Sequence, residues 1–217
     1  MPDYTARRIM MVDTQVRPSD VTKFPIIDAM LDVPREEFVP TAQSEAAYVG
    51  ENLDIGAGRT LLDPRTLAKM LDVLAIGNDE LVLDLGCGLG YSSAVIARIA
   101  EAVVAVEADE AMAAEASEIL MNTGADNVAV HCGALVDGSA KHGPYDVIVV
   151  EGGVGEVPAS LSDQLKDGGR IAAIFMDGAL GEVRVGLKRG QDVSWRMAFN
   201  ATAPVLSGFE QKAEFQL

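Results

Sequence analysis

The sequence predicts an α/β fold in which a doubly wound, mostly parallel sheet of seven strands is closed by an antiparallel hairpin. Three observations lead to this prediction. From residue 79 onward, short apolar runs alternate with helical patterns, which is typical of parallel strands joined by crossover helices. Near the end of the chain, two alternating runs flank a turn at Gly190, a pattern that favours a hairpin. Hydrophobic residues make up 49% of the 217, enough for one full core.

The predicted elements of the sheet follow one another in a regular order. Parallel strands are expected at 81–85, 102–107, 127–132, 145–151 and 169–175. The crossover helices between them are expected at 91–100, 109–123 and 157–166. The closing hairpin is expected to pair 182–188 with 193–199.

Residues 1–78 precede the sheet and are predicted to form a helical extension. Helices are expected at 4–16, 22–32 and 64–75. No flexible linker separates this extension from residues 79–217, so the chain is interpreted as a single domain. We expect the extension to pack over the carboxyl ends of the strands, where ligands bind in open α/β sheets.

A glycine-rich loop follows the first strand of the sheet. Asp84 lies in that strand, and glycines stand at positions 86, 88 and 90 before the next helix. Residues without a side chain let the backbone approach a ligand closely. Dinucleotide-binding loops require glycine or alanine three residues after the second glycine, where this chain has Tyr91. The loop therefore predicts a nucleoside cofactor site that is not a dinucleotide site.

Glu107 is the second candidate for the cofactor site. It ends the predicted strand 102–107, and an acid at that place can accept hydrogen bonds from both ribose hydroxyls. The same acid could instead stabilise the positive end of the helix that begins at 109. Glu107 thus supports an adenosine-containing ligand without deciding between methyl and hydride transfer.

The charge of the chain excludes several partners. Seventeen basic and 33 acidic residues give a formal net charge of −16, which disfavours binding to nucleic acid. No apolar run approaches the roughly 20 residues that cross a bilayer. The N-terminal residues lack a secretory signal, so we expect a cytoplasmic protein that binds neither nucleic acid nor membrane.

Cysteine and histidine give no sign of a metal site. Cys87 and Cys132 are too few for a disulfide framework or a zinc site, and packing is the expected role of both. His131 and His142 have no further ligand at a metal-like spacing. The sequence therefore predicts chemistry without a metal ion.

Several motifs resemble one enzyme family. Residues 84–91 resemble motif I of the S-adenosylmethionine-dependent methyltransferases. The N-terminal part resembles the protein-L-isoaspartate O-methyltransferases, and the likeness extends from about residue 10 to 175. The segments that carry it are 15–18, 29–30, 33–40, 47–48, 55–56, 58–64, 145–150, 156–158 and 164–170.

The resemblance implies a Rossmann-like methyltransferase fold, S-adenosylmethionine as cofactor, and methylation of the carboxylate of isoaspartyl residues in damaged proteins. Such a carboxylate is ionised at neutral pH and needs no general base. The substrate loop would contribute Arg59, Thr60 and Leu62 to catalysis. The implied cofactor residues are Asp84, Gly86, Cys87, Gly88, Gly90, Tyr91, Glu107, Ala108, Ala134, Leu135 and Glu151.

The chain departs from the family pattern at three positions. Leu62 stands where the family has a serine, Ala134 where it has an aspartate, and Glu151 where it has a threonine. Thr60 is kept, and Arg59 adds a cation that can hold a carboxylate. Glu151 would repel a carboxylate substrate unless it is paired, for example with Arg59. It could also act as a base toward another nucleophile, or be a solvated strand end.

These departures leave other functions open. One alternative is a divergent relative that methylates a different acceptor. Another is a catalytically silent protein that acts as a cofactor-binding or regulatory module. A nicotinamide-dependent oxidoreductase is disfavoured by Tyr91 and by the closing hairpin. The sequence gives no indication of the oligomeric state.

Overall fold

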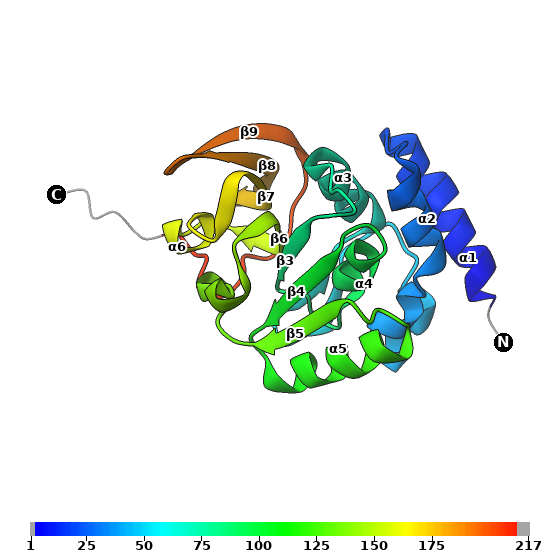
Figure 1. Ribbon diagram of the computed structural model, residues 1–217. Helices are drawn as coiled ribbons and strands as arrows, with labels where there is room; N and C mark the ends of the chain where they lie inside the picture. The colour runs from blue at the N-terminus through cyan, green and yellow to red at the C-terminus, as the bar shows by residue number, and fades with distance from the viewer. Residues whose placement is uncertain (1–2, 212–217) are drawn as a thin grey trace.

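A seven-stranded mixed sheet forms the centre of the molecule (Figure 1). The computed structural model describes residues 3–211. The strands lie in the order β5-β4-β3-β6-β7-β8-β9. The first five strands in this order pair in parallel, whereas β8 pairs antiparallel with both β7 and β9. This confirms the predicted parallel sheet with its closing hairpin. The bounds are β3 Leu81–Leu85, β4 Ala102–Glu107, β5 Val128–Cys132, β6 Tyr145–Val154, β7 Leu165–Asp177, β8 Leu180–Arg189 and β9 Asp192–Asn200.

The central strands are apolar on both faces because both faces are covered. In β3, Val82 belongs to the cluster under the helices, whereas Leu83 and Leu85 belong to the cluster on the opposite face. Such continuous apolar runs are easy to recognise, and the predicted bounds of β3 and β4 match the observed ones.

Five α-helices lie on one side of the sheet. Helices α3, α4 and α5 pack on the strands, and α2 packs on α3 and α4. Their bounds are α1 Tyr4–Met11, α2 Phe24–Asp32, α3 Pro64–Leu74, α4 Tyr91–Ala97 and α5 Glu110–Asn122. The first predicted helix is α-helical only to Met11 and continues as a π-helical segment, Val12–Val16, followed by a 3-10 turn, Arg17–Ser19.

Among residues 3–211, the opposite face of the sheet carries only short helices and a C-terminal segment. Two 3-10 turns, Leu135–Asp137 and Ala140–His142, and the four-residue α6, Ala159–Ser162, replace full crossover helices. The predicted helix 157–166 is therefore wrong beyond α6. The helix ends early because the carbonyl of Gln164 accepts a hydrogen bond from the amide of Tyr145 at 2.8 Å. This bond pairs the chain with β6, and β7 begins at the next residue.

The C-terminal segment, residues 201–211, covers part of this second face. Leu206 and Phe209 are almost fully buried in its apolar cluster. The amide of Gly155 donates to the Phe209 carbonyl at 2.7 Å, and Gly153 forms a parallel bridge with Val205. The segment thus takes a place on the sheet that helices fill on the other face.

The N-terminal extension shares the core of the sheet, with Met11, Met30 and Phe38 in the same apolar cluster as Val82. It contains two further 3-10 segments, Arg35–Phe38 and Thr41–Ala46. It also contains a separate two-stranded sheet, the β1–β2 hairpin, formed by β1 Leu53–Gly56 and β2 Arg59–Leu61.

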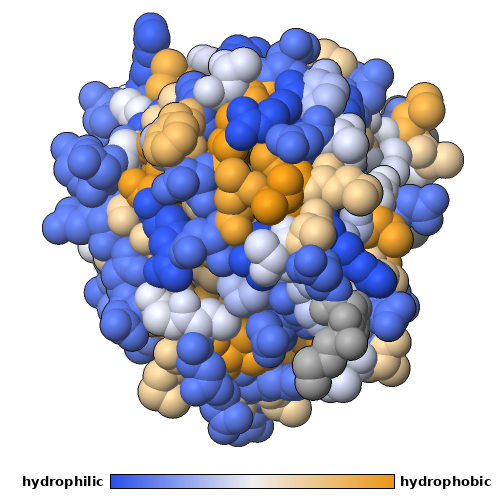
Figure 2. All heavy atoms as spheres, turned by 90° about the vertical axis from the view of Figure 1, so that its right-hand side faces the viewer, coloured by the Kyte–Doolittle hydropathy of each residue, from blue (hydrophilic) through white to orange (hydrophobic). Residues whose placement is uncertain are grey.

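The expected position of the extension is only partly correct. Helix α2 packs beside α3 and α4, with α1 against it, whereas the β1–β2 hairpin comes to the loop after β3, and Arg35 and Phe38 pack on Tyr91 beside that loop. Figure 2 looks onto the side of α1 and α2 and shows a mostly hydrophilic surface with an apolar patch near its centre. Ile9, Met10 and Phe24 are exposed apolar residues of these two helices. Within residues 3–211, no helix is long and apolar enough to span a membrane.

Candidate active site

The glycine-rich loop lies at the carboxyl end of β3 and is packed against elements from distant parts of the chain. Gly86, Gly88 and Gly90 have φ values of 78°, 57° and 97°, in the region that favours glycine. A Cβ atom on Gly88 would lie 2.6 Å from the Cδ1 atom of Ile55, in the β1–β2 hairpin. On Gly86 it would lie 3.4 Å from Leu206. The hairpin and the C-terminal segment therefore both contact this loop.

Three acidic side chains lie at the carboxyl ends of three neighbouring strands. Asp84 of β3 is in register with Ala105 of β4 and Val149 of β6. Glu107 and Glu151 come two residues after those partners, so the three carboxylates are on the same face of the sheet. All three are buried. The prediction that Glu151 is a solvated strand end is therefore wrong.

Asp84 is held by the first turn of α4. The hydroxyls of Ser92 and Ser93 donate to its Oδ2 atom at 2.7 and 2.5 Å. No donor in the described part of the chain reaches the Oδ1 atom. Burial raises the pKa of Asp84 to about 6, against the effect of the two serines, and the charge of Glu107 adds to the rise.

Glu151 is the second carboxylate with an unsatisfied oxygen. Its Oε1 atom is buried and has no hydrogen-bond partner among residues 3–211. Burial raises its pKa well above the ordinary value; the charge of Asp84 raises it further, and that of Arg35 lowers it. The proposed pairing of Glu151 with Arg59 is wrong, because Arg59 pairs with Glu107.

Arg35 is a buried cation that the sequence analysis did not single out. It is fully buried and donates from Nε to the Ala47 carbonyl at 2.6 Å and from Nη2 to the Leu62 carbonyl at 2.7 Å. Its guanidinium lies 4.6 Å from the centre of the Tyr91 ring, which also packs edge-on against Phe38. Tyr91 therefore fixes the N-terminal extension to the start of α4. An arginine within an otherwise ordinary turn gives no sequence signal of such burial.

Glu107 accepts four hydrogen bonds and forms an ion pair. The Nε atom of Arg59 donates to Oε2 at 2.9 Å, and its Nη2 atom lies 2.8 Å from Oε1 in the ion pair. The amide of Gly88 donates to Oε2 at 3.1 Å, and the amides of Ala108 and Asp109 donate to Oε1 at 2.7 and 3.0 Å. Arg59 is 5% exposed and Glu107 is 0% exposed, so this ion pair is shielded from water.

The predicted catalytic residues of the substrate loop lie in different surroundings. Arg59 faces Glu107, and half-buried Thr60 pairs with Asp54 across the hairpin. Leu62 is 1% exposed and belongs to the apolar core, where burying a leucine side chain is favourable by about 2 kcal/mol. Its role in catalysis stays a prediction.

The remaining predicted cofactor residues border the glycine-rich loop to different degrees. Cys87 is buried, and burial raises the pKa of its thiol well above the ordinary value. Leu135 is buried against Gly86, at 3.5 Å from the position of an added Cβ atom. Ala134 is exposed before the turn that begins at Leu135.

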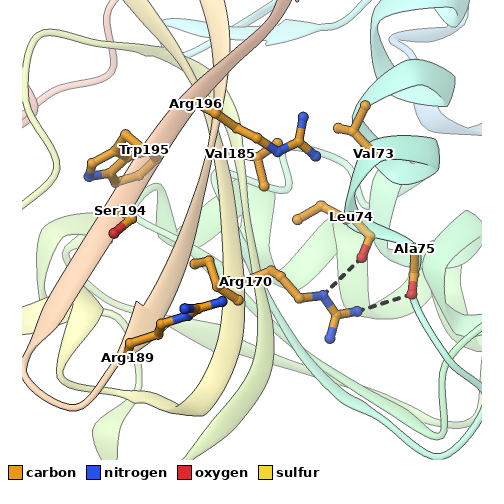
Figure 3. A pocket seen from close by; sticks show the side chains of 10 residues that line it. Val73, Leu74, Ala75, Arg170, Val185, Arg189, Ser194, Trp195 and Arg196 are labelled. Carbon is orange, nitrogen blue, oxygen red and sulfur yellow. Dashed lines mark hydrogen bonds between the residues drawn. The ribbon is translucent and has the colours of Figure 1, made fainter.

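A cavity of about 470 Å³ lies elsewhere, between α3 and the β8–β9 hairpin (Figure 3). Arg170 lines it and donates to the carbonyls of Leu74 and Ala75 at 2.9 and 3.0 Å. It also binds Glu80 through both carboxylate oxygens. In the described residues no group of three or more side chains could hold a metal ion.

Comparison with known proteins places these features in one family. A family model described as protein-L-isoaspartate(D-aspartate) O-methyltransferase matches residues 9–185. Protein-L-isoaspartate O-methyltransferase 2 of Syntrophobacter fumaroxidans is 42% identical over 67% of this chain, and the match spans 59% of that protein. The protein-L-isoaspartate O-methyltransferase of Roseiflexus castenholzii is 36% identical over 88% of this chain and 86% of its own length.

Two solved structures have a similar fold. One protein-L-isoaspartate O-methyltransferase superposes on 93% of this chain and 66% of its own, with a TM-score of 0.81 and 26% identity. A second structure, a putative enzyme of this name from Plasmodium falciparum in complex with S-adenosyl-L-homocysteine, covers 95% of this chain and 99% of its own. Its TM-score is 0.79 at 17% identity, which supports the fold alone.

Proposed function

This chain belongs to the protein-L-isoaspartate(D-aspartate) O-methyltransferase family and is an S-adenosylmethionine-dependent methyltransferase, and we propose that it methylates the carboxylate of isoaspartyl residues in damaged proteins. The observation that carries the proposal is the row of three buried carboxylates beside the glycine-rich loop, at the strand ends where open α/β sheets bind ligands.

The residues of this site fit the cofactor. S-adenosylmethionine, when bound, supplies a methyl group carried on a positively charged sulfur. Asp84 and Glu151 each offer a buried oxygen that has no donor in the described part of the chain, and an ammonium group such as that of methionine would satisfy both. Glu107, at the end of β4, would accept from the ribose hydroxyls. Gly88 lets the backbone come close to the ligand.

The substrate needs little proton chemistry from the protein. An isoaspartyl carboxylate is already ionised at neutral pH, so it can act as a nucleophile without a general base. The task of the protein is to align that carboxylate and to exclude water from it. The β1–β2 hairpin is in a position to do both, because it lies directly over Gly88. It also places a cation, Arg59, at the site of a protein whose net charge is −16, and a cation attracts a carboxylate substrate.

A second candidate function has one observation in its favour. Burial raises the pKa of Glu151 well above the usual range, so its carboxylate, when ionised, is a stronger base than an ordinary one. Glu151 would then serve as general base toward a neutral nucleophile, such as a hydroxyl or an amine. In that case the chain methylates an acceptor other than a carboxylate.

We propose the cytoplasm as the place of action, as the sequence predicts, with isoaspartyl proteins as substrates. Transfer of a labelled methyl group from S-adenosylmethionine to an isoaspartyl peptide tests the function, with the aspartyl peptide of the same sequence as control. We expect label in the isoaspartyl peptide alone. If the isoaspartyl peptide stays unlabelled while a protein extract accepts label, and Glu151→Gln abolishes this labelling while still binding S-adenosylhomocysteine, the second candidate replaces the first.

A further inference from the structure

Arg59 occupies the hydrogen-bonding positions that a ribose would need on Glu107. A carboxylate offers about four lone-pair positions, and Glu107 already accepts four hydrogen bonds, one of them from Arg59, whose Nη2 atom also forms an ion pair with Oε1. The three backbone donors are fixed by the ends of the loop and of β4. Ribose hydroxyls can therefore reach Glu107 only when Arg59 leaves it.

We propose that Arg59 moves between two carboxylates during the reaction: it binds Glu107 before the cofactor does, and it then captures the carboxylate of the isoaspartyl substrate. This inference rests on the proposed function. It makes Arg59 the residue that links cofactor binding to substrate recognition.

The β1–β2 hairpin can carry Arg59 between these positions. Its two strands are not part of the seven-stranded sheet, and a two-stranded sheet on its own is marginally stable in water. Two contacts hold it at the glycine-rich loop, the ion pair of Arg59 with Glu107 and the packing of Ile55 on Gly88. Leu61 packs in the core, and Gln43 donates to the Asp54 carbonyl at 3.0 Å, so the hairpin stays attached when the ion pair opens.

Arg59 is also the cation best suited to receive the substrate. A guanidinium group binds a carboxylate through paired hydrogen bonds, and few other side chains do so. Arg35, the other buried arginine, has a buried Nη1 atom without a partner in the described residues, but its Nε and Nη2 atoms donate to the carbonyls of Ala47 and Leu62 and hold it against Tyr91 in the core. Methylation removes the negative charge of the substrate, so Arg59 loses its partner and returns to Glu107 once the demethylated cofactor has left.

The exchange predicts positive coupling between the two ligands. The cofactor releases Arg59 for the substrate, and a substrate that holds Arg59 leaves Glu107 free for the cofactor. Thermodynamic linkage requires each ligand to tighten binding of the other by the same factor. A residue that only stabilised the fold would produce no such coupling.

Calorimetric titration with S-adenosylhomocysteine and an isoaspartyl peptide, singly and together, tests this prediction. In the wild type, each ligand should tighten the other at least about tenfold. Arg59→Gln should bind S-adenosylhomocysteine alone at least about tenfold tighter, because no buried ion pair must open, and should lose the coupling. Arg65→Gln, which removes an exposed arginine, should behave as the wild type.

A second variant guards against failure of Arg59→Gln to fold. Ile55→Ala weakens the other contact of the hairpin and keeps the cation, so it should tighten S-adenosylhomocysteine binding a fewfold while the coupling remains. Thermal unfolding of each variant shows which of them are folded.

Any one of three results would overturn the inference. The first is that folded Arg59→Gln binds S-adenosylhomocysteine no tighter than the wild type, and the second is that the coupling between the two ligands survives in that variant. The third is that Ile55→Ala binds S-adenosylhomocysteine no tighter than the wild type. Methyl transfer by the wild type is measured separately. If the wild type labels isoaspartyl peptide while the coupling survives in Arg59→Gln, the proposed function stands and the exchange is wrong. If the wild type binds no S-adenosylhomocysteine, both fall.

Discussion

The hydroxyl of Ser93 donates to Asp84 across 2.5 Å and so joins the first turn of α4 to β3. A second hydroxyl, from Ser92, reaches the same carboxylate oxygen, and the other oxygen has no partner in the described residues. The carboxylate is therefore firmly positioned and only half satisfied. Such a group costs stability when it is ionised and gains a partner when a cationic ligand arrives.

The first prediction concerns stability against pH. The pKa of Asp84 in the folded protein is about 6, above its ordinary value of 3.8. Its contribution to the free energy of unfolding is therefore fully present below pH about 4 and is lost as the pH rises through about 6. In Asp84→Asn, the fall in the free energy of unfolding between pH 4 and pH 8 should be about 2–3 kcal/mol smaller than in the wild type. Urea unfolding from pH 4 to 8 measures the effect. Asp126→Asn, at an exposed site, is the control, and an unchanged pH slope in Asp84→Asn would contradict the prediction.

The second prediction concerns Glu107. Glu107→Ala removes the acceptor for the ribose hydroxyls, and each hydrogen bond to a charged group contributes about 1.5–3 kcal/mol. Affinity for S-adenosylhomocysteine should fall at least about tenfold in calorimetry, and NAD should bind to neither protein. Glu110→Ala, which removes an exposed acid of α5, should bind as the wild type. Retained affinity in Glu107→Ala would show that the ribose lies elsewhere.

The third prediction reverses an expectation from the sequence. A serine at position 62 would restore the residue of the family pattern, and from sequence alone it is expected to assist catalysis. Because Leu62 is 1% exposed, Leu62→Ser should instead lower the free energy of unfolding by about 3–5 kcal/mol. Urea unfolding measures the loss, and Leu180→Ser, at a site that is 77% exposed, should cost far less. A faster enzyme of unchanged stability would contradict this prediction.

The fourth prediction concerns Arg170, which joins α3 to the sheet. Arg170→Ala removes two hydrogen bonds to carbonyls at the end of α3 and leaves Glu80 without its partner. The free energy of unfolding should fall by about 2 kcal/mol, since the pair is only partly buried. The Arg170 guanidinium lowers the pKa of Glu80, so the loss should shrink as the pH falls and Glu80 is protonated. Arg196→Ala, at an exposed site of the same cavity, is the control.

The sequence predicts those parts of the molecule that depend on local pattern. The bounds of β3 and β4 follow from apolar runs that end at Leu85 and Glu107, and the glycine-rich loop from its spacing. The short α6 could not be predicted, because its end is set by the pairing of Gln164 with Tyr145 in another strand.

The sequence singles out residues of the candidate site but not their partners in the structure. Glu107 and Arg59 were both selected from the sequence, yet they are 48 positions apart, and their pairing depends on how the hairpin packs on Gly88. Likewise, Leu62 follows a strand in which alternate side chains point to opposite sides, and only the packed structure shows which side is the core.

The C-terminal segment has a consequence for synthesis of the protein. Residues 201–211 are synthesised after all seven strands. Until Leu206 and Phe209 arrive, apolar side chains of β3 and β6 on that face lack part of their cover. A chain made only as far as β9 therefore holds every strand of the sheet but leaves apolar surface exposed, which favours aggregation.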